Sequence, residues 1–363
     1  MQAAPPELPL RVRQRFASLH ALIGDTPLVE LDCRVEGVRV RVFAKHEVVN
    51  LTGSIKDRMA LGILAEAWSS GAVHEGTRIA EATSGNTGIA FAALGRALAH
   101  PVRIYMPDWM SRERVQLIQS LGAEVVPVSV AEGGFLGSIA LADRYAREHP
   151  GRVFLPHQFA NQANVRAHAR GTGPELLEQL RRAGVEPQAF VAGVGTGGTV
   201  MGVGQYLRSE VHGLRVHPLE PADSPTLRTG QKAGHHRIQG ISDEFVPPIV
   251  DLGQLDAIVD VRDGDAILAA QRVARELGLG VGISSGANLL GALQVGRALG
   301  DDSVVATVFP DSNKKYLSTD LLRDEPVRPG DLAPRVVFEA VRVHPRLGRG
   351  SEGGVLRALL AQA

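Results

Sequence analysis

One lysine, Lys56 in the stretch TGSIKDRMA, has the position of a nucleophilic amine. Only five of the 39 basic residues are lysines, so arginine is the usual cation of this chain and each lysine invites a specific explanation. Lys56 falls at the predicted start of a helix, where the partial positive charge of the helix end disfavours a cation. The same field, together with burial in a cleft, favours the neutral amine that forms Schiff bases. The alternative is a lysine whose side chain simply reaches solvent.

The segment EATSGNTGIA places polar groups between an apolar strand and a helix. The hydroxyls of Thr83, Ser84 and Thr87 surround the predicted amino end of that helix, together with the amide of Asn86. Such an end binds carboxylates or phosphates, because its backbone N–H groups lack partners within the helix. We therefore predict an anion site here, and an ordinary polar turn is the simpler alternative.

A second loop, GVGTGGT, also links a predicted strand to a predicted helix. Its glycines allow backbone amides to approach a phosphate closely, and Thr196 and Thr199 add hydroxyl donors. The loop is thus a second candidate anion site.

The same loop matches the dinucleotide fingerprint G-x-G-x-x-G through Gly193, Gly195 and Gly198, with Glu220 as the acidic partner. The match is weak, because Glu220 lies farther along the chain than the usual spacing of about 20 residues. A lysine available to an aldehyde, a carboxylate loop and a phosphate loop instead predict pyridoxal phosphate with a bound amino acid.

From about Leu22 to Leu321 the chain resembles the cysteine synthase and cystathionine β-synthase family of pyridoxal-phosphate enzymes, which includes the O-acetylserine sulfhydrylases of fold type II. Eleven motifs carry the resemblance in order: IGDTPLVEL, NLTGSIKDR, EATSGNTGIAFA, MPDWMSRER, LGAEVV, HQFANQANVRAH, TGPEL, GVGTGGT, IQGI, GISSGA and PDSNKKYLST.

The resemblance implies a role for each of several residues. Lys56 would carry the cofactor as a Schiff base and, once freed, remove the Cα proton of the substrate. Asn86 would hydrogen-bond the ring hydroxyl, and Ser284 would face the pyridine nitrogen, with Ser285 as the second candidate. The cofactor phosphate would bind to Gly195, Thr196, Gly197, Gly198 and Thr199. The substrate carboxylate would bind to Thr83, Ser84, Thr87 and Gln158.

A serine hydroxyl at the ring nitrogen cannot protonate it as an aspartic acid can, which fits β-elimination better than transamination. The resemblance therefore implies β-replacement on an activated serine, O-acetylserine or O-phosphoserine, through an aminoacrylate. Sulfide or thiosulfate would add to give L-cysteine or S-sulfocysteine. One alternative is condensation with homocysteine, as in cystathionine β-synthase; more remote ones are a non-catalytic binding relative and a dinucleotide enzyme.

Two segments depart from the family pattern. Ser242, Asp243 and Glu244 stand in GISDEF where plain cysteine synthases have small residues, so this loop is bulkier and more acidic. An acidic turn on the surface is the alternative to a role in the cleft. Lys314 and Lys315 stand in PDSNKKYLST, where Gly-Glu-Arg is common. They could bind an anionic donor or sulfur source, but a solvated loop is the favoured interpretation.

Short β-branched runs alternate with helical patterns, which predicts βαβ units around mainly parallel sheets. The resemblance implies the two-lobed α/β fold of the tryptophan synthase β-subunit, each lobe being a mostly parallel sheet flanked by helices. We expect a smaller, substrate-closing lobe at 50–160, a larger cofactor-phosphate lobe at 10–49 plus 161–325, and an extension at 326–363 that ends in a short apolar helix. Ser54 and Asp57 predict a capping box for the helix at Lys56.

The composition indicates small-molecule chemistry. The 39 basic residues balance 39 acidic ones, so neither a nucleic-acid surface nor a membrane surface is expected. No apolar stretch has the length of a signal or a membrane span, which predicts a cytoplasmic protein. A single cysteine, Cys33, excludes an internal disulfide and a multi-cysteine metal site, and we expect no metal. Family members are commonly homodimers, so the resemblance implies a homodimer.

Overall fold

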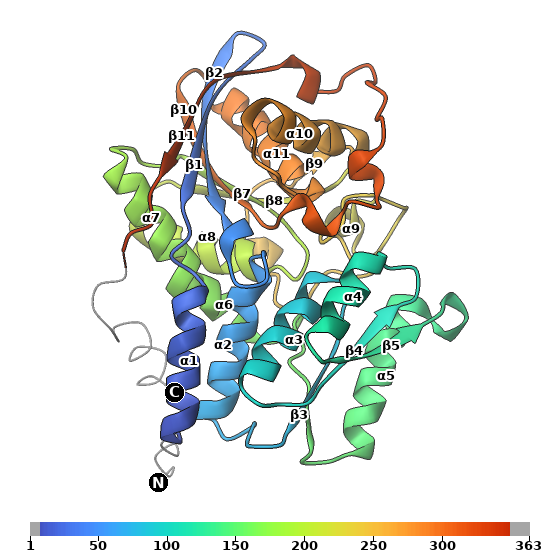
Figure 1. Ribbon diagram of the computed structural model, residues 1–363. Coiled ribbons are helices and arrows are strands. Elements are labelled where there is room, and N and C mark those ends of the chain that lie inside the picture. The colour runs from blue at the N-terminus through green and yellow to red at the C-terminus, as the bar shows by residue number, and fades with distance from the viewer. Residues whose placement is uncertain (1–7, 349–363) are drawn as a thin grey trace.

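The computed structural model describes residues 8–348, which form two β-sheets with helices on their faces (Figure 1). The smaller sheet has four parallel strands in the order β5-β4-β3-β6. These strands are β3 (Arg78–Ala82), β4 (Val102–Pro107), β5 (Glu124–Val128) and β6 (Val153–Phe154).

Helices cover both faces of the smaller sheet. Successive strand residues point to opposite faces, so Ile79 packs with one hydrophobic cluster and Ala80 with another. The Ile79 face carries α2 (Lys56–Ser69), α3 (Asn86–Ala97) and α4 (Arg112–Ser120), whereas the Ala80 face carries α5 (Gly134–Glu148).

The first helix, α1 (Leu10–Leu22), also packs against the smaller sheet's helices. Its buried residues Val12, Phe16 and Leu19 belong to the cluster that contains Met59 of α2. We expected residues 10–49 to belong to the larger lobe, but α1 packs against the helices of the smaller sheet. The lobe boundaries themselves stay a prediction.

The larger sheet has seven strands in the order β11-β1-β2-β10-β7-β8-β9. Five neighbouring strands of this sheet are parallel: β2, β10, β7, β8 and β9. Strand β1 runs antiparallel to both of its neighbours, β2 and β11. The strands are β1 (Leu28–Val35), β2 (Val38–His46), β7 (Ala189–Gly193), β8 (Arg215–Pro221), β9 (Val259–Val261), β10 (Ser303–Phe309) and β11 (Val336–His344). The predicted α/β class with mostly parallel sheets is confirmed.

The last strand belongs to the segment predicted as an extension. β11 pairs with β1 along nearly its whole length and forms the edge of the larger sheet. This part of the extension therefore packs on the body of the protein, while the apolar helix predicted near the C-terminus lies outside the described residues.

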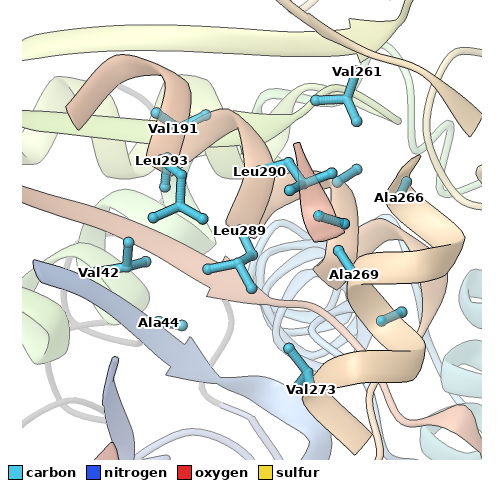
Figure 2. Packing of buried hydrophobic residues seen from close by; sticks show 14 of the residues in the cluster. Val42, Ala44, Val191, Val261, Ala266, Ala269, Val273, Leu289, Leu290 and Leu293 are labelled. Carbon is cyan, nitrogen blue, oxygen red and sulfur yellow. The ribbon is translucent and has the colours of Figure 1, made fainter. Parts of the chain in front are cut away.

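Helices also cover both faces of the larger sheet. One face packs against α10 (Asp263–Leu277) and α11 (Ile283–Leu299) through aliphatic side chains such as Val191 and Leu289 (Figure 2). The other face packs against α7 (Gly173–Arg182) and α8 (Gly198–Glu210) through residues such as Phe190. Each fully buried Val or Leu in such a layer contributes about 1.5–3 kcal/mol relative to an exposed one. Two shorter helices, α6 (Gln162–Ala167) and α9 (Thr226–Thr229), lie in the connections.

Parallel strands of both sheets end beside one cavity. Thr83 follows β3, Gly193 ends β7 and Pro310 follows β10, and all three line that cavity. In open α/β sheets, ligands bind at the carboxyl ends of the strands. Among the helices of residues 8–348, none combines the length and the apolar character that crossing a bilayer requires.

Candidate active site

A cavity of about 420 Å³ brings together residues that are far apart in the sequence. Of the twelve residues that sequence reasoning selected, eleven line it: Lys56, Thr83, Ser84, Asn86, Thr87, Gln158, Gly195, Thr196, Gly197, Thr199 and Ser284. Gly198 is the exception, since it is buried at the first position of α8.

Lys56 is the first residue of α2 and lines the cavity with its side chain half-buried. Burial lowers the pKa of its amine, and the carboxylates of Asp311 and Asp243 oppose that shift only in part. The predicted property of Lys56, an amine that is more easily neutral than an ordinary lysine, is present in the fold.

The capping box predicted for α2 is wrong. No side chain caps this helix, and the hydroxyl of Ser54 has no hydrogen-bond partner among the described residues. Asp57 instead accepts hydrogen bonds from the backbone N–H of Thr52 at 2.7 Å and from its hydroxyl at 2.5 Å. The carboxylate thus orders the loop before the helix, and burial raises its pKa to about 6.

The loop before α3 is held in place by hydrogen bonds between its own residues and a distant glutamine. The hydroxyl of Thr87 donates to Oε1 of Gln158 at 2.6 Å, and Nε2 of Gln158 donates to the carbonyl of Ala82 at 2.8 Å. The backbone N–H of Gly85 donates to the hydroxyl of Thr83 at 3.0 Å. Three of the four residues expected to bind the substrate carboxylate are therefore fixed before any ligand enters.

The glycine-rich loop before α8 packs so closely against neighbouring segments that side chains at two of its glycines would clash with them. A Cβ on Gly195 would lie 2.3 Å from the carbonyl oxygen of Gly240, and one on Gly197 would lie 2.1 Å from Val250. Gly197 also has φ +88°, which favours glycine. The hydroxyl of Thr196 accepts from Nδ2 of Asn164 at 2.9 Å. The loop thus lines the cavity largely with backbone, an arrangement that suits a phosphate.

The two candidate serines for the ring nitrogen differ in position. Ser284 lines the cavity at the start of α11, whereas Ser285 is fully buried and its hydroxyl has no partner among the described residues. The geometry favours Ser284. Together, the half-buried lysine, the glycine cradle and this serine are groups that fit pyridoxal phosphate.

A hydrogen-bond network that the sequence did not predict runs along one side of the cavity. Lys315 donates from Nζ to Oδ1 of Asn86 at 2.7 Å, and Nδ2 of Asn86 donates to Oδ2 of Asp311 at 2.8 Å. The hydroxyl of Tyr316 donates to the same carboxylate oxygen at 2.5 Å. The favoured interpretation of a solvated loop is therefore wrong for Lys315, which is 3% exposed, although Lys314 is exposed.

Asp243 lies in the cavity wall, so the interpretation of GISDEF as a surface turn is wrong for this residue. Burial raises the pKa of its carboxyl to about 6, and the nearby amine of Lys56 limits the rise. Its neighbour Glu244 pairs with Lys232 at 2.6 Å, and both residues also line the cavity. The departure from the family pattern was the available signal, but only the fold shows where the loop points.

The alternative interpretation, a dinucleotide site, requires that Glu220 be available to a ligand. Glu220 is buried in β8, where its carboxylate accepts from the backbone N–H of Leu227 at 2.6 Å and pairs with Arg228 at 3.3 Å. It does not line the cavity. Glu220 therefore has a structural role and is not available to bind a ribose.

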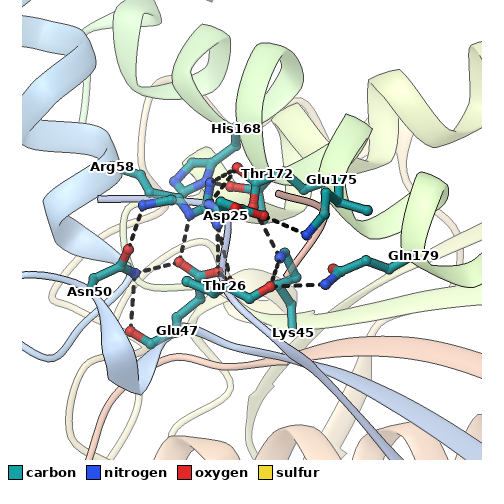
Figure 3. Close-up of polar contacts among 12 residues, drawn as sticks. Asp25, Thr26, Lys45, Glu47, Asn50, Arg58, His168, Thr172, Glu175 and Gln179 are labelled. Carbon is teal, nitrogen blue, oxygen red and sulfur yellow. Dashed lines mark hydrogen bonds and ion pairs between the residues drawn. The ribbon is translucent and has the colours of Figure 1, made fainter. Parts of the chain in front are cut away.

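A buried ionic cluster anchors the helix that carries Lys56 (Figure 3). Arg58 of α2 binds Glu47 and Glu175, each at 2.6 Å, and Lys45 of β2 pairs with Glu175 at 3.0 Å. Since Glu175 lies on α7 and Lys45 on β2, the cluster joins the amino end of α2 to the larger sheet and its helix.

The family model described as "Pyridoxal-phosphate dependent enzyme" matches residues 19–311 of the chain. A probable cysteine synthase of Bacillus subtilis is 41% identical over 300 residues, covering 83% of this chain and 96% of the relative.

Two solved structures are also similar. A hydrogen sulfide-producing enzyme from Fusobacterium nucleatum is 51% identical with a TM-score of 0.87, covering 91% of this chain and 99% of that one. A variant of that enzyme was solved with an α-aminoacrylate intermediate. An O-acetylserine-dependent cystathionine β-synthase from Helicobacter pylori is 32% identical with a TM-score of 0.75, covering 84% and 98% of the two chains.

Proposed function

Because this chain belongs to the family of pyridoxal-phosphate-dependent enzymes, as a cysteine synthase-like member, we propose that it releases sulfide from L-cysteine and adds a neutral nucleophile in its place. The nucleophile is water, which gives serine, or a small thiol, which gives a thioether. The observation that carries this proposal is the carboxyl group of Asp243 in the cavity wall beside Lys56.

The charge of Asp243 discriminates between nucleophiles. A carboxylate in a partly desolvated cavity repels anions such as hydrosulfide and thiosulfate, and it also repels the phosphate of O-phosphoserine. Water and thiols must instead lose a proton as they add, and a base whose pKa lies near the working pH accelerates that step most effectively. The carboxyl of Asp243, with its pKa at about 6, suits a neutral nucleophile.

The other residues have roles that follow from their positions. Bound pyridoxal phosphate supplies an electron sink for the negative charge that develops at Cα. Lys56, with its lowered pKa, removes the Cα proton, and Thr83, Ser84, Thr87 and Gln158 hold the substrate carboxylate. The Cβ–S bond breaks and hydrosulfide leaves. A Cβ–O bond to water then forms while Asp243 takes the proton of the water and passes it to solvent, and Lys56 returns its proton to Cα to give serine.

A second candidate is a different β-replacement at the same site, in which O-acetylserine or O-phosphoserine loses acetate or phosphate and sulfide or thiosulfate adds at Cβ to form L-cysteine or S-sulfocysteine. The similarity to a probable cysteine synthase supports it. The similarity to an O-acetylserine-dependent cystathionine β-synthase supports homocysteine as a third nucleophile.

One experiment separates these candidates. The purified enzyme with pyridoxal phosphate is incubated with L-cysteine in water enriched in oxygen-18, and sulfide and serine are measured. We expect sulfide together with an equal amount of labelled serine, or of thioether when a thiol is added, and no turnover by Lys56→Ala. Rapid conversion of O-acetylserine and sulfide to L-cysteine, without sulfide release from L-cysteine, would favour the second candidate instead.

We also propose that the protein acts in the cytoplasm as a homodimer. The resemblance of the sequence to a family whose members are commonly homodimers supports the dimer. Light scattering coupled to size-exclusion chromatography tests the dimer, and cell fractionation tests the location.

A further inference from the structure

Lys315 is a buried lysine whose direct partners are uncharged; burial lowers the pKa of its amine, and the nearby carboxylates of Asp311 and Asp57 oppose that shift and favour the charged form. Its amine donates to the amide oxygen of Asn86 at 2.7 Å and to the carbonyl oxygen of Gly53 at 3.4 Å, with 3% of the residue exposed. Lys45, the other fully enclosed lysine of residues 8–348, has a carboxylate partner in Glu175 at 3.0 Å. Burying a charge without a directly bonded counter-ion is costly. Retaining Lys315 in such a place therefore points to a task at Asn86.

The two neighbours of the Asn86 side chain determine which way its amide faces. A protonated lysine amine only donates hydrogen bonds to an amide, and an ionised carboxylate only accepts them. Lys315 therefore selects the amide oxygen, and Asp311 selects the amide nitrogen, to which it lies at 2.8 Å. Rotating the amide by half a turn would place two donors together and two acceptors together. The amide has a single favourable orientation.

That orientation leaves one hydrogen of Nδ2 available. Within the described residues Nδ2 makes a single hydrogen bond, to Asp311, and Asn86 lines the cavity. The hydroxyl of Tyr316 donates to the same oxygen of Asp311 at 2.5 Å and supports the carboxylate as an acceptor. Asn86 thus has one N–H group available to a ligand, while its carbonyl oxygen accepts a hydrogen bond from the amine of Lys315.

We propose that Lys315 is a positioning residue that acts through Asn86: it orients the amide so that an N–H faces an electron-rich oxygen of the bound cofactor, and its charge stabilises that oxygen in the anionic form. The inference rests on the proposed function only in requiring pyridoxal phosphate at this cavity, and it is independent of the identity of the substrate. The failure of sulfide release from L-cysteine would therefore leave it standing.

The test titrates pyridoxal phosphate onto the apoprotein and follows the visible absorbance of the bound cofactor as the pH changes. Lys315→Met is expected to weaken cofactor binding about tenfold or more, the loss typical of a hydrogen bond to a charged group. Its visible band is expected to convert at higher pH, because the oxygen is protonated more easily without the cation. Lys315→Arg should restore both properties in large part, and the adjacent exposed Lys314→Met should behave as the wild type.

A double-variant cycle decides whether Lys315 acts through Asn86. Lys315→Met should add no further loss in cofactor binding to that of Asn86→Ala. Additive losses, an unshifted pH profile, or equal effects of Lys314→Met and Lys315→Met would overturn the proposal. Circular dichroism of each apoprotein checks folding, and Lys315→Gln replaces Lys315→Met in the same cycle should the latter not fold.

Discussion

Asp243 and Lys56 shift each other's pKa in the direction opposite to that of burial. Burial lowers the pKa of the Lys56 amine, and Asp243 raises it in part. Burial raises the pKa of the Asp243 carboxyl to about 6, and Lys56 lowers it in part. The pair thus keeps an amine of lowered pKa and a carboxyl of raised pKa within one cavity, as is typical of functional sites.

The pH profile of the reaction should depend on Asp243. As pH rises through about 6 the carboxyl of Asp243 ionises and becomes a base, so kcat/KM for sulfide release should rise over this range. Asp243→Asn should remove this limb and lower kcat/KM at pH 8 by about 10²–10⁴-fold, the usual contribution of a general base. Steady-state rates across pH check this. Glu244→Gln is the matched control, and an intact limb in Asp243→Asn would exclude Asp243 as the base.

Arg58 should be essential for the stability of α2. Arg58→Met leaves Glu47 and Glu175 buried without this partner, which typically costs about 3–5 kcal/mol. The exposed pair of Arg181 with Glu210 provides the control, since Arg181→Met should change the free energy of unfolding by no more than about 1 kcal/mol. Urea unfolding of both variants measures the difference. Equal stabilities would show that the cluster does not anchor the helix.

Gly197→Ala should abolish cofactor binding while Gly213→Ala should not. Both glycines have a positive φ, +88° and +75°, so both variants carry similar backbone strain. A Cβ at Gly197 meets Val250 at 2.1 Å inside the cradle, whereas one at Gly213 meets nothing within 4 Å. Titration with pyridoxal phosphate compares the two. Cofactor binding by Gly197→Ala with wild-type affinity would show that the loop is not the phosphate cradle.

Glu81 should make the stability of the apoprotein fall as pH rises. Burial raises the pKa of its carboxyl from 4.5 to about 8, so between these values the folded state holds a proton that the unfolded state has released. Unfolding then releases protons, and the free energy of unfolding decreases with increasing pH across this window. Glu81→Gln should flatten the slope in chemical denaturation at several pH values. A slope unchanged by the substitution would mean that other groups titrate there.

Sequence reasoning succeeded where a residue's environment is set by its own motif. The glycine loop, the Thr83–Thr87 turn and Lys56 each combine a local pattern with a strand or helix end, and the fold brings them into one cavity. The capping box failed because α2 begins at Lys56, so Ile55 rather than Ser54 is the residue before the helix, and Asp57 binds Thr52 instead.

The misjudged residues are those whose environment comes from distant segments. Lys315 is buried because Asn86 and Gly53, both more than 200 positions earlier in the chain, surround its amine. No local pattern carries that information. Similarly, α1 packs against apolar residues of α2 and α3. Its own sequence does not show which surface it will cover.

The pairing of β11 with β1 affects how the chain can fold during synthesis. β1 begins at Leu28 and is among the first strands made, but its edge partner ends at His344. Until the ribosome has translated that far, β1 presents unpaired backbone groups along one side, a template for wrong strand addition. Closing so long a loop is also slow. The nascent protein should therefore be most prone to aggregate in the interval between the completion of β10 and the release of β11 from the ribosome.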